Sequence, residues 1–180
     1  MVKPDGGRLM TIRGCSAWVR LVALALAGMT ATAAEMPCGD AKSHQFDFWI
    51  GDWEVTLRDG GKIVGFNRIM PILDGCVLQE NWRGVSGSAG SSLNFYDTGT
   101  RRWRQFWVWR EGTTLELAGE YRDGRMVLEG DSTEPDGKVV RNRITWFDSG
   151  DGSVRQLWEI SRNASKTWEV VFDGIYRKRP

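Results

Sequence analysis

Turn signals recur at short and even intervals along this chain of 180 residues, from about residue 59 onward. Aspartate–glycine pairs at positions 59–60, 74–75, 123–124 and 136–137 favour tight hairpin turns. The segments between the turns alternate apolar and polar side chains, which is typical of strands with one wet face. The sequence therefore predicts ten strands, whose first residues lie 11 to 15 positions apart.

The opening strand is expected within Phe46–Val55, where side chains alternate from Trp49. The later strands are expected at 62–72, 76–83, 91–96, 102–110, 113–122, 125–130, 138–147, 153–161 and 167–178. Residues 84–90 are expected to form a flexible loop at the rim. No stretch after residue 34 shows a convincing helical period, so helix is expected only as a short turn near the start.

Every predicted link between strands is short enough for an antiparallel hairpin. Closing such a meander into a barrel removes both unpaired edges of the sheet. The predicted fold class is therefore all-β, a single antiparallel up-and-down β-barrel of about ten strands, calycin-like and with little helix. A β-sandwich is the alternative, although it normally requires a long crossover connection that the sequence lacks.

The first 34 residues have the features of a secretory signal peptide. Basic residues are followed by an apolar stretch, Leu21–Ala27, and by small residues at Ala31–Ala34 that suit cleavage. The apolar part is too short to span a bilayer core of about 30 Å, so no transmembrane segment is expected after cleavage. Met1 and Met10 both stay open as the start of the chain.

The expected organisation is a cleaved signal peptide at 1–34, a polar lead-in at 35–45 and a β-barrel domain at 46–180. The expected location is the periplasm or the exterior of a bacterial cell. In such an oxidising compartment, Cys38 and Cys76 are expected to form a disulfide. Two unpaired buried thiols are the alternative, because the sequence does not show whether their α-carbons lie close together.

Six short motifs, beginning with Phe-Asp-Phe-Trp-Ile-Gly at 46–51, carry a resemblance to a known family. The others are Gly75-Cys76, Asn94-Phe95-Tyr96-Asp97, Trp103-Arg104-Gln105-Phe106-Trp107-Val108, Arg155-Gln156-Leu157-Trp158-Glu159 and the ending at 172–177. Together they resemble a family of exported bacterial proteins with an FDFWIG motif, over nearly all of residues 45–178. The resemblance implies a lipocalin-like barrel and export. It implies no activity, because the function of that family is unknown.

Gly51-Asp52-Trp53 resembles the Gly-x-Trp element that opens the lipocalin and other calycin barrels. In those barrels the Trp lies at the closed end, and an Arg from the last strand covers it. The resemblance therefore implies structural roles for Gly51, Trp53 and Arg177. It also implies that the first and last strands pair.

Several predicted strands place a single polar side chain on an otherwise apolar, tryptophan-rich face. A buried polar group without a partner costs on the order of 1 to 3 kcal/mol. These groups are therefore expected either to bond to one another in a packed core or to face a ligand cavity. The candidate ligand-binding residues are Glu80, Trp82, Trp103, Gln105, Trp107, Asn142, Trp146, Gln156 and Trp158.

The leading hypothesis is an exported barrel that binds a small, largely apolar molecule in this Trp-lined interior. The alternative is a packed structural or protein-interaction module of the cell envelope with no small ligand. A minor alternative is a hydrolase or isomerase that uses Glu80 with Arg141 or Arg143. The sequence favours a protein that is not an enzyme, and it identifies no protein partner.

Other function classes find little support in the sequence. Residues 101–110 interleave arginine with aromatic side chains, but strand alternation explains the pattern, and a near-neutral charge argues against nucleic acid as a partner. His44 is the single histidine, so it cannot build a multi-histidine metal site. A Ser-His-Asp triad would depend on the same His44, and no Gly-x-Ser-x-Gly elbow is present. No metal or other cofactor is expected.

Overall fold

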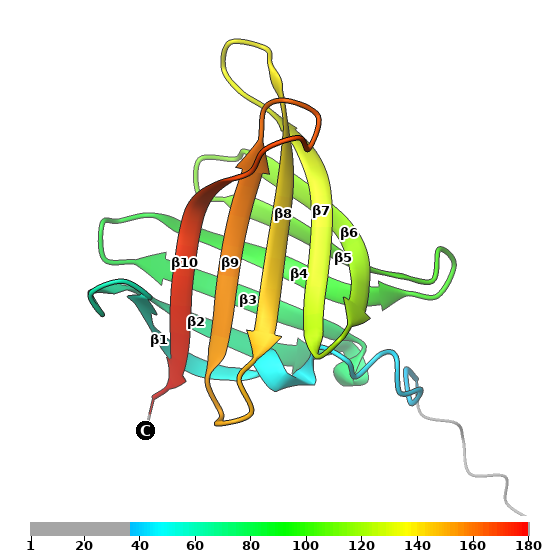
Figure 1. The fold of residues 1–180 in the computed structure, drawn as a ribbon. Helices are drawn as coiled ribbons and strands as arrows, with labels where there is room; N and C mark the ends of the chain where they lie inside the picture. Colours follow the sequence, from blue (N-terminus) through cyan, green and yellow to red (C-terminus); the bar gives the residue numbers. More distant parts are fainter. Residues whose placement is uncertain (1–36, 180) are drawn as a thin grey trace, which may run out of the picture. The chain divides into compact units, whose positions relative to one another are not determined.

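Ten antiparallel strands close into one up-and-down β-barrel in the computed structural model, which describes residues 37–179 (Figure 1). The strands are β1 (Gly51–Leu57), β2 (Ile63–Ile72), β3 (Val77–Gly84), β4 (Ala89–Asp97), β5 (Arg102–Trp109), β6 (Thr114–Arg122), β7 (Arg125–Thr133), β8 (Val139–Asp148), β9 (Val154–Ser161) and β10 (Glu169–Lys178). Each strand pairs with its neighbours along the chain, and β1 also pairs with β10. The predicted fold class is confirmed. The predicted signal peptide lies outside the described residues.

The predicted turn chemistry accounts for the hairpins. Asp123 and Gly124 connect β6 to β7, and both have positive φ, 51° and 75°. A two-residue hairpin turn of type I′ requires positive φ at both positions, and Asp-Gly is a favoured pair for it. The twist of such a turn matches the twist of the flanking strands, so β6 and β7 continue the sheet without a break.

The predicted start of the first strand is wrong. β1 begins at Gly51, and the residues before it form a 3-10 turn, η1 (Asp47–Trp49). Such a turn has about three residues per repeat, so Phe46 and Trp49 lie on the same side of it. Both side chains are fully buried. The spacing of three between these aromatic residues outweighs the alternation that begins at Trp49.

The predicted bounds of the loop at 84–90 are also wrong. β3 ends at Gly84, β4 begins at Ala89, and residues 85–88 form a tight turn. The N–H of Gly84 donates to the carbonyl of Ser88 at 2.7 Å, which closes the turn. The only other helical segment in residues 37–179 is a second 3-10 turn, η2 (Leu73–Gly75). No helix in that range has the length and apolar character needed to cross a membrane.

The turn η1, drawn in cyan at the lower end of the barrel in Figure 1, closes that end with aromatic side chains. Phe46 stacks on Trp49 with ring centroids 4.9 Å apart. It also meets Trp103 and Trp146 edge-on at 5.7 Å and 5.2 Å. The indole N–H of Trp53 donates to the carbonyl of Trp49 at 2.9 Å. We call Phe46 and Trp49 the aromatic plug, because they fill the barrel end with packed rings.

A disulfide joins Cys38 to Cys76, with α-carbons 5.3 Å apart. This confirms the predicted pairing over the alternative of two unpaired thiols. Cys76 directly follows η2, so the bond ties the lead-in to the connection between β2 and β3. Disulfides persist in oxidising compartments, and the bond is therefore compatible with a location outside the cytoplasm.

The predicted cover of Trp53 by Arg177 is wrong, although β1 and β10 pair as expected. Trp53 lies opposite Lys178 in the register, and Lys178 Nζ lies 5.5 Å from the indole centroid. Side chains alternate along a strand, so Tyr176 points inward and Arg177 points outward. The Arg177 guanidinium lies on the exposed side, 3.4 Å from Thr56 Oγ1.

The indole ring of Trp53 packs closely against the backbone of Gly51, as the predicted structural role of this glycine requires. Its φ is 154°, and a Cβ atom at this position would lie 3.2 Å from the indole of Trp53. Few side chains adopt that backbone conformation, and few have room beside a fixed ring. Glycine here lets the chain leave η1 and enter β1 directly under Trp53.

We expect Lys178→Ala to lower the free energy of unfolding by about 0.5 to 1 kcal/mol, because it removes a cation from the face of Trp53. Arg177→Ala is the matched control one position away, and we expect a change within about 0.5 kcal/mol. Urea denaturation followed by circular dichroism measures both changes. A larger loss for Arg177→Ala than for Lys178→Ala would contradict this assignment.

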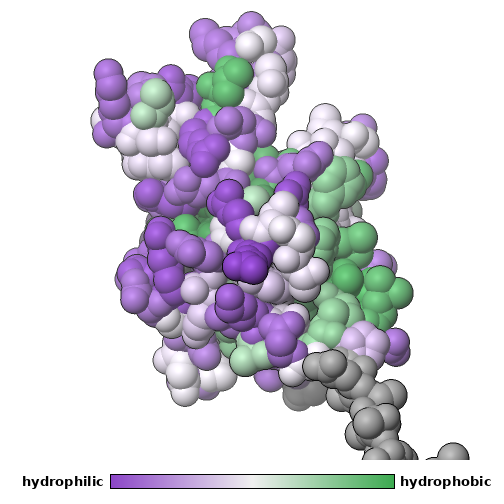
Figure 2. All heavy atoms as spheres, turned by 90° about the vertical axis from the view of Figure 1, so that its right-hand side faces the viewer, coloured by the Kyte–Doolittle hydropathy of each residue, from purple (hydrophilic) through white to green (hydrophobic). Residues whose placement is uncertain are grey.

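Apolar side chains also gather on part of the outer surface. Figure 2 shows hydrophobic residues along the right-hand side of the view and mainly hydrophilic residues on the left. Leu93 of β4 lies opposite Phe106 of β5, and Val108 lies two positions further along β5. These three side chains are each about 40% exposed. We call them the outer apolar strip.

Candidate functional site

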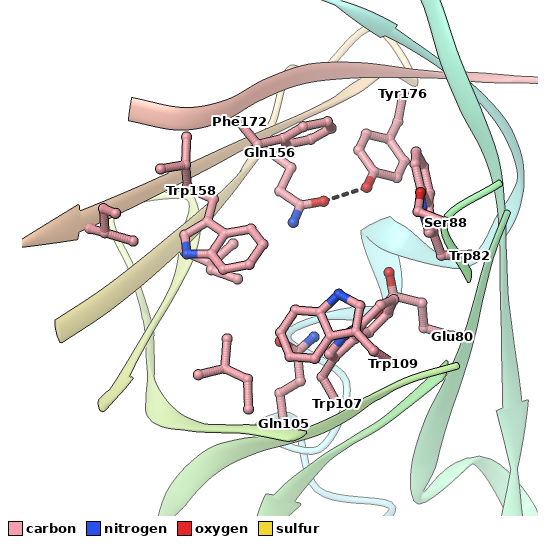
Figure 3. A pocket seen from close by; sticks show the side chains of 14 residues that line it. Glu80, Trp82, Ser88, Gln105, Trp107, Trp109, Gln156, Trp158, Phe172 and Tyr176 are labelled. Atoms are coloured by element: carbon pink, nitrogen blue, oxygen red, sulfur yellow. Dashed lines mark hydrogen bonds between the residues drawn. The ribbon is translucent and has the colours of Figure 1, made fainter. Parts of the chain in front are cut away.

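The part of the barrel away from the aromatic plug contains a cavity of about 430 Å³ that is open to solvent. The cavity is lined by Glu80, Trp82, Ser88, Gln105, Trp107, Trp109, Leu115, Ile144, Gln156, Trp158, Ile160, Val171, Phe172 and Tyr176. In Figure 3, Glu80, Trp82 and Tyr176 lie on one side of the cavity, and Trp158 lies across from them. The wall is therefore mostly aromatic, with a few polar groups placed on it.

The aromatic rings of the wall contact one another as well as the open space. Trp107 and Trp109 meet edge-on with centroids 5.6 Å apart, and Trp109 lies 6.2 Å from Trp158. Trp82 and Phe172 meet edge-on at 6.4 Å. Such contacts favour fixed ring orientations, so the wall presents a defined set of faces to a ligand.

Glu80 on β3 is the acceptor at the end of a chain of buried hydrogen bonds. Asn67 Nδ2 donates to Glu80 Oε1 at 2.7 Å, and Ser92 Oγ donates to Glu80 Oε2 at 2.6 Å. Asn94 Nδ2 donates to Ser92 Oγ, and Gln105 Nε2 donates to Asn94 Oδ1, both at 2.8 Å. Every hydrogen bond in this series is donated in the direction of the Glu80 carboxylate.

Neighbouring strands bring these polar groups together by register. Glu80 lies directly opposite Ser92, and Asn94 lies directly opposite Gln105. Directly opposite side chains on one face of an antiparallel pair have Cβ atoms about 5 Å apart. Three adjacent strands, β3, β4 and β5, therefore build one continuous polar row inside the barrel.

Burial raises the pKa of Glu80 from its ordinary 4.5 to about 7, and the hydrogen bonds from Ser92 and Asn67 act in the opposite direction. Burial and the negative charge of Glu80 also raise the pKa of Tyr176 well above its ordinary value. The Tyr176 hydroxyl donates to Gln156 Oε1, as Figure 3 shows. Tyr176 is thus neutral near pH 7, whereas Glu80 is poised between its two forms.

The predicted pairing of Glu80 with Arg141 or Arg143 is wrong. Arg141 bonds to Glu129 and Asp131 on β7, and it is partly exposed. Arg143 bonds to Glu159 at 3.0 Å and lies over the ring of Trp168 at 3.9 Å. Both arginines alternate with inward residues of β8, so they point away from the interior. The enzyme hypothesis loses the cation that it relied on.

Six of the nine predicted ligand-binding residues line the cavity. They are Glu80, Trp82, Gln105, Trp107, Gln156 and Trp158. Trp103 and Trp146 do not, because they lie nearer the closed end and pack on the aromatic plug. Asn142 is buried on the inner face of β8 but does not line the cavity, and its Oδ1 accepts from the indole N–H of Trp158 at 3.0 Å. It orients a cavity residue instead of meeting the open space.

The sequence interpretation missed eight lining residues. They are Ser88, Trp109, Leu115, Ile144, Ile160, Val171, Phe172 and Tyr176. The alternation that identified the predicted residues on the same strands also predicts an inward direction for Trp109, Ile144 and Ile160. Val171 and Phe172 follow from a register shift in β10, between Val170 and Phe172, for which the sequence gives no signal.

The cavity wall carries acidic but no basic chemistry. Among its lining residues, Glu80 and Tyr176 are the ionisable ones, and none is lysine, arginine or histidine. Within residues 37–179, no cluster of three or more His, Cys, Asp or Glu side chains has a geometry suited to a metal ion. No family model matches the chain, and no curated protein matches it.

Proposed function

We propose that this protein is an exported β-barrel that binds a small, largely apolar molecule in its Trp-lined cavity. The observation that carries the proposal is a cavity of about 430 Å³ with four tryptophans and a phenylalanine on its wall. Sites for small molecules typically measure about 300 to 1,000 Å³ and combine apolar walls with a few polar groups. A barrel whose interior served packing alone would fill this space as completely as it fills the plugged end.

Export belongs to the same proposal. The support is the secretory pattern of residues 1–34 together with the Cys38–Cys76 disulfide, which suits an oxidising compartment. Membership of the exported FDFWIG-motif family is proposed on the resemblance of the motifs alone. Purified native protein from a periplasmic or secreted fraction, with its first residue identified by mass spectrometry, tests cleavage near Ala34.

Titration with apolar ligands should change the intrinsic tryptophan fluorescence of the protein in a saturable way. Trp158→Ala removes one wall of the cavity, so we expect the affinity to fall about tenfold to a hundredfold, as for loss of a buried aromatic contact. Trp168→Ala is the matched control, because Trp168 lies on Arg143 outside the cavity. We expect it to leave the affinity unchanged. Isothermal titration calorimetry gives both values without relying on fluorescence.

A panel of small apolar and aromatic compounds that produces no saturable change would overturn the binding proposal.

The second candidate is a protein-interaction module of the cell envelope. The observation that favours this candidate is the outer apolar strip, because exposed apolar side chains in register on neighbouring strands are a feature of interaction surfaces. Phe106→Gln lowers the apolar area of this strip without touching the cavity, and under the binding proposal it leaves ligand affinity unchanged.

A further inference from the structure

We propose that the ligand is a cationic amine with an aromatic or other apolar body, and that Glu80 binds its ammonium group. The inference rests on the proposed function and names the chemical class of its ligand. It follows from three features of the cavity: a carboxylate with free acceptor capacity, a wall of aromatic faces, and the absence of any basic side chain among the lining residues.

The hydrogen bonds around Glu80 prepare it to act as an anion. Its two oxygens each accept one bond, from Asn67 and from Ser92. A carboxylate has about four acceptor sites, so about two of them are left for a ligand. Ser92 is itself oriented by Asn94, which fixes the direction of its donation. A protonated carboxyl group would not need two donors aimed at it.

The positive charge that such an anion needs is not provided by the surrounding described residues. β2 contributes Asn67, β4 contributes Ser92 and Asn94, and β10 contributes Tyr176. Of these groups only Tyr176 titrates, and it stays neutral near pH 7 because its pKa is raised. Glu80 is also the one acidic or basic side chain among the buried polar residues of the described part. A buried carboxylate is costly without a cation, and a ligand can supply that cation.

The aromatic wall suits the same ligand. An ammonium group is attracted to the face of an indole ring within about 6 Å of its centroid, and more strongly where water is excluded. Trp82 lies on the Glu80 side of the cavity in Figure 3, and Trp107 and Trp109 line the same cavity from β5, two strands away from Glu80. Trp158 and Phe172 complete the wall and can accept the apolar body of the ligand.

Anionic ligands fit this cavity poorly. A fatty-acid carboxylate would meet Glu80 with no lysine, arginine or histidine on the wall to neutralise it. Two carboxylates sharing one site repel each other, and one of them must take up a proton. The chemistry of the wall therefore separates amines from acids of the same size.

The experiment compares three compounds with one ring system: 1-naphthylmethylamine, 1-naphthalenemethanol and 1-naphthoic acid, measured by isothermal titration calorimetry at pH 8. We expect the amine to bind at least about tenfold more tightly than the alcohol, and the acid most weakly. Glu80→Gln should reduce amine affinity about tenfold to a hundredfold and leave alcohol affinity nearly unchanged. Glu116→Gln is the matched control, because Glu116 is an exposed glutamate on β6.

The pH dependence of the wild-type protein tests the inference without any variant. Between pH 6 and pH 8 the ionised fraction of Glu80 rises roughly tenfold, since its pKa is about 7. Amine affinity should rise by about the same factor, while alcohol affinity stays flat. Equal affinities for the amine and the alcohol would overturn the amine assignment and leave the proposed function standing. No binding of any of the three, nor of the wider panel, would overturn the proposed function itself.

Discussion

Replacing both Cys38 and Cys76 with serine is expected to lower the free energy of unfolding by about 3 to 4 kcal/mol. The disulfide closes a loop that spans 38 positions in the sequence, and a loop of that length removes about this much conformational freedom from the unfolded chain. Urea denaturation of the wild-type protein and the double variant, followed by circular dichroism, measures the difference. Reduction of the wild-type protein should produce the same loss and should not affect the variant.

The position of this disulfide predicts which part of the folded protein is destabilised most when the bond is removed. Cys38 lies in the lead-in, before the aromatic plug, and Cys76 lies between η2 and β3. Without the bond, the plug is held by ring contacts and by the hydrogen bond from Trp53. We therefore expect amide hydrogen exchange in η1 to accelerate more than exchange in β8. A loss below about 1 kcal/mol would show that ring packing alone holds this segment in the folded state.

Local chemistry along the chain determines the strand order of this barrel, which is why it could be predicted. A turn such as Asp123-Gly124 permits one hairpin geometry, and alternation decides which side chains point inward. A succession of such hairpins has one simple way to remove its edges, which is closure of β1 on β10. Of these steps, only the final closure pairs residues far apart in the sequence.

How far a side chain lies from the closed end of the barrel is not determined by the local sequence. For this reason the sequence did not predict which inward-facing tryptophans line the cavity. Trp103 and Trp107 lie on the same face of β5, four residues apart. The first packs on Phe46 of the plug, and the second lines the cavity. Alternation gives both the same inward direction. Only the position of the plug distinguishes them, and that position comes from a 3-10 turn that the alternation concealed.

Parity of register explains why the wrong cation was assigned to Trp53. Neighbouring residues on a strand face opposite sides, so Arg177 and Lys178 cannot exchange roles without a shift of the whole strand. The register shift between Val170 and Phe172 changes the parity along β10 relative to β9. A resemblance to another barrel can indicate that a cation covers the Trp, but it does not fix which of two adjacent residues is that cation.

The stability of the protein is expected to fall as the pH rises from about 4.5 to about 7, because burial raises the pKa of Glu80 across this window. Below 4.5 the carboxyl group is protonated in both the folded and the unfolded chain, so nothing is lost. Between the two values the unfolded chain releases its proton while the folded chain keeps it. Above pH 7 the full difference, about 3 kcal/mol, weighs against the folded state.

Glu80→Gln should remove this slope, because the amide does not ionise and can still accept from Asn67 or Ser92. We expect the variant to match the wild-type protein at pH 4.5 and to be about 1 to 3 kcal/mol more stable at pH 8. His44 contributes a slope of the same sign, since its pairing with Asp47 raises its pKa. His44→Asn therefore serves as the control that isolates the share of Glu80. Urea denaturation at pH 4.5, 6, 7 and 8 measures all three proteins.

A more stable Glu80→Gln variant would show that the barrel carries a destabilising group at neutral pH. Such a cost is typical of residues that are arranged for binding and not for folding. A cationic ligand should reverse it, because an ammonium group on the carboxylate stabilises the charged form only in the folded protein. At pH 8 and saturating 1-naphthylmethylamine, the wild-type melting temperature should therefore rise while that of Glu80→Gln changes much less. A wild-type protein already as stable as Glu80→Gln at pH 8 would contradict the raised pKa and leave Glu80 as a satisfied core residue.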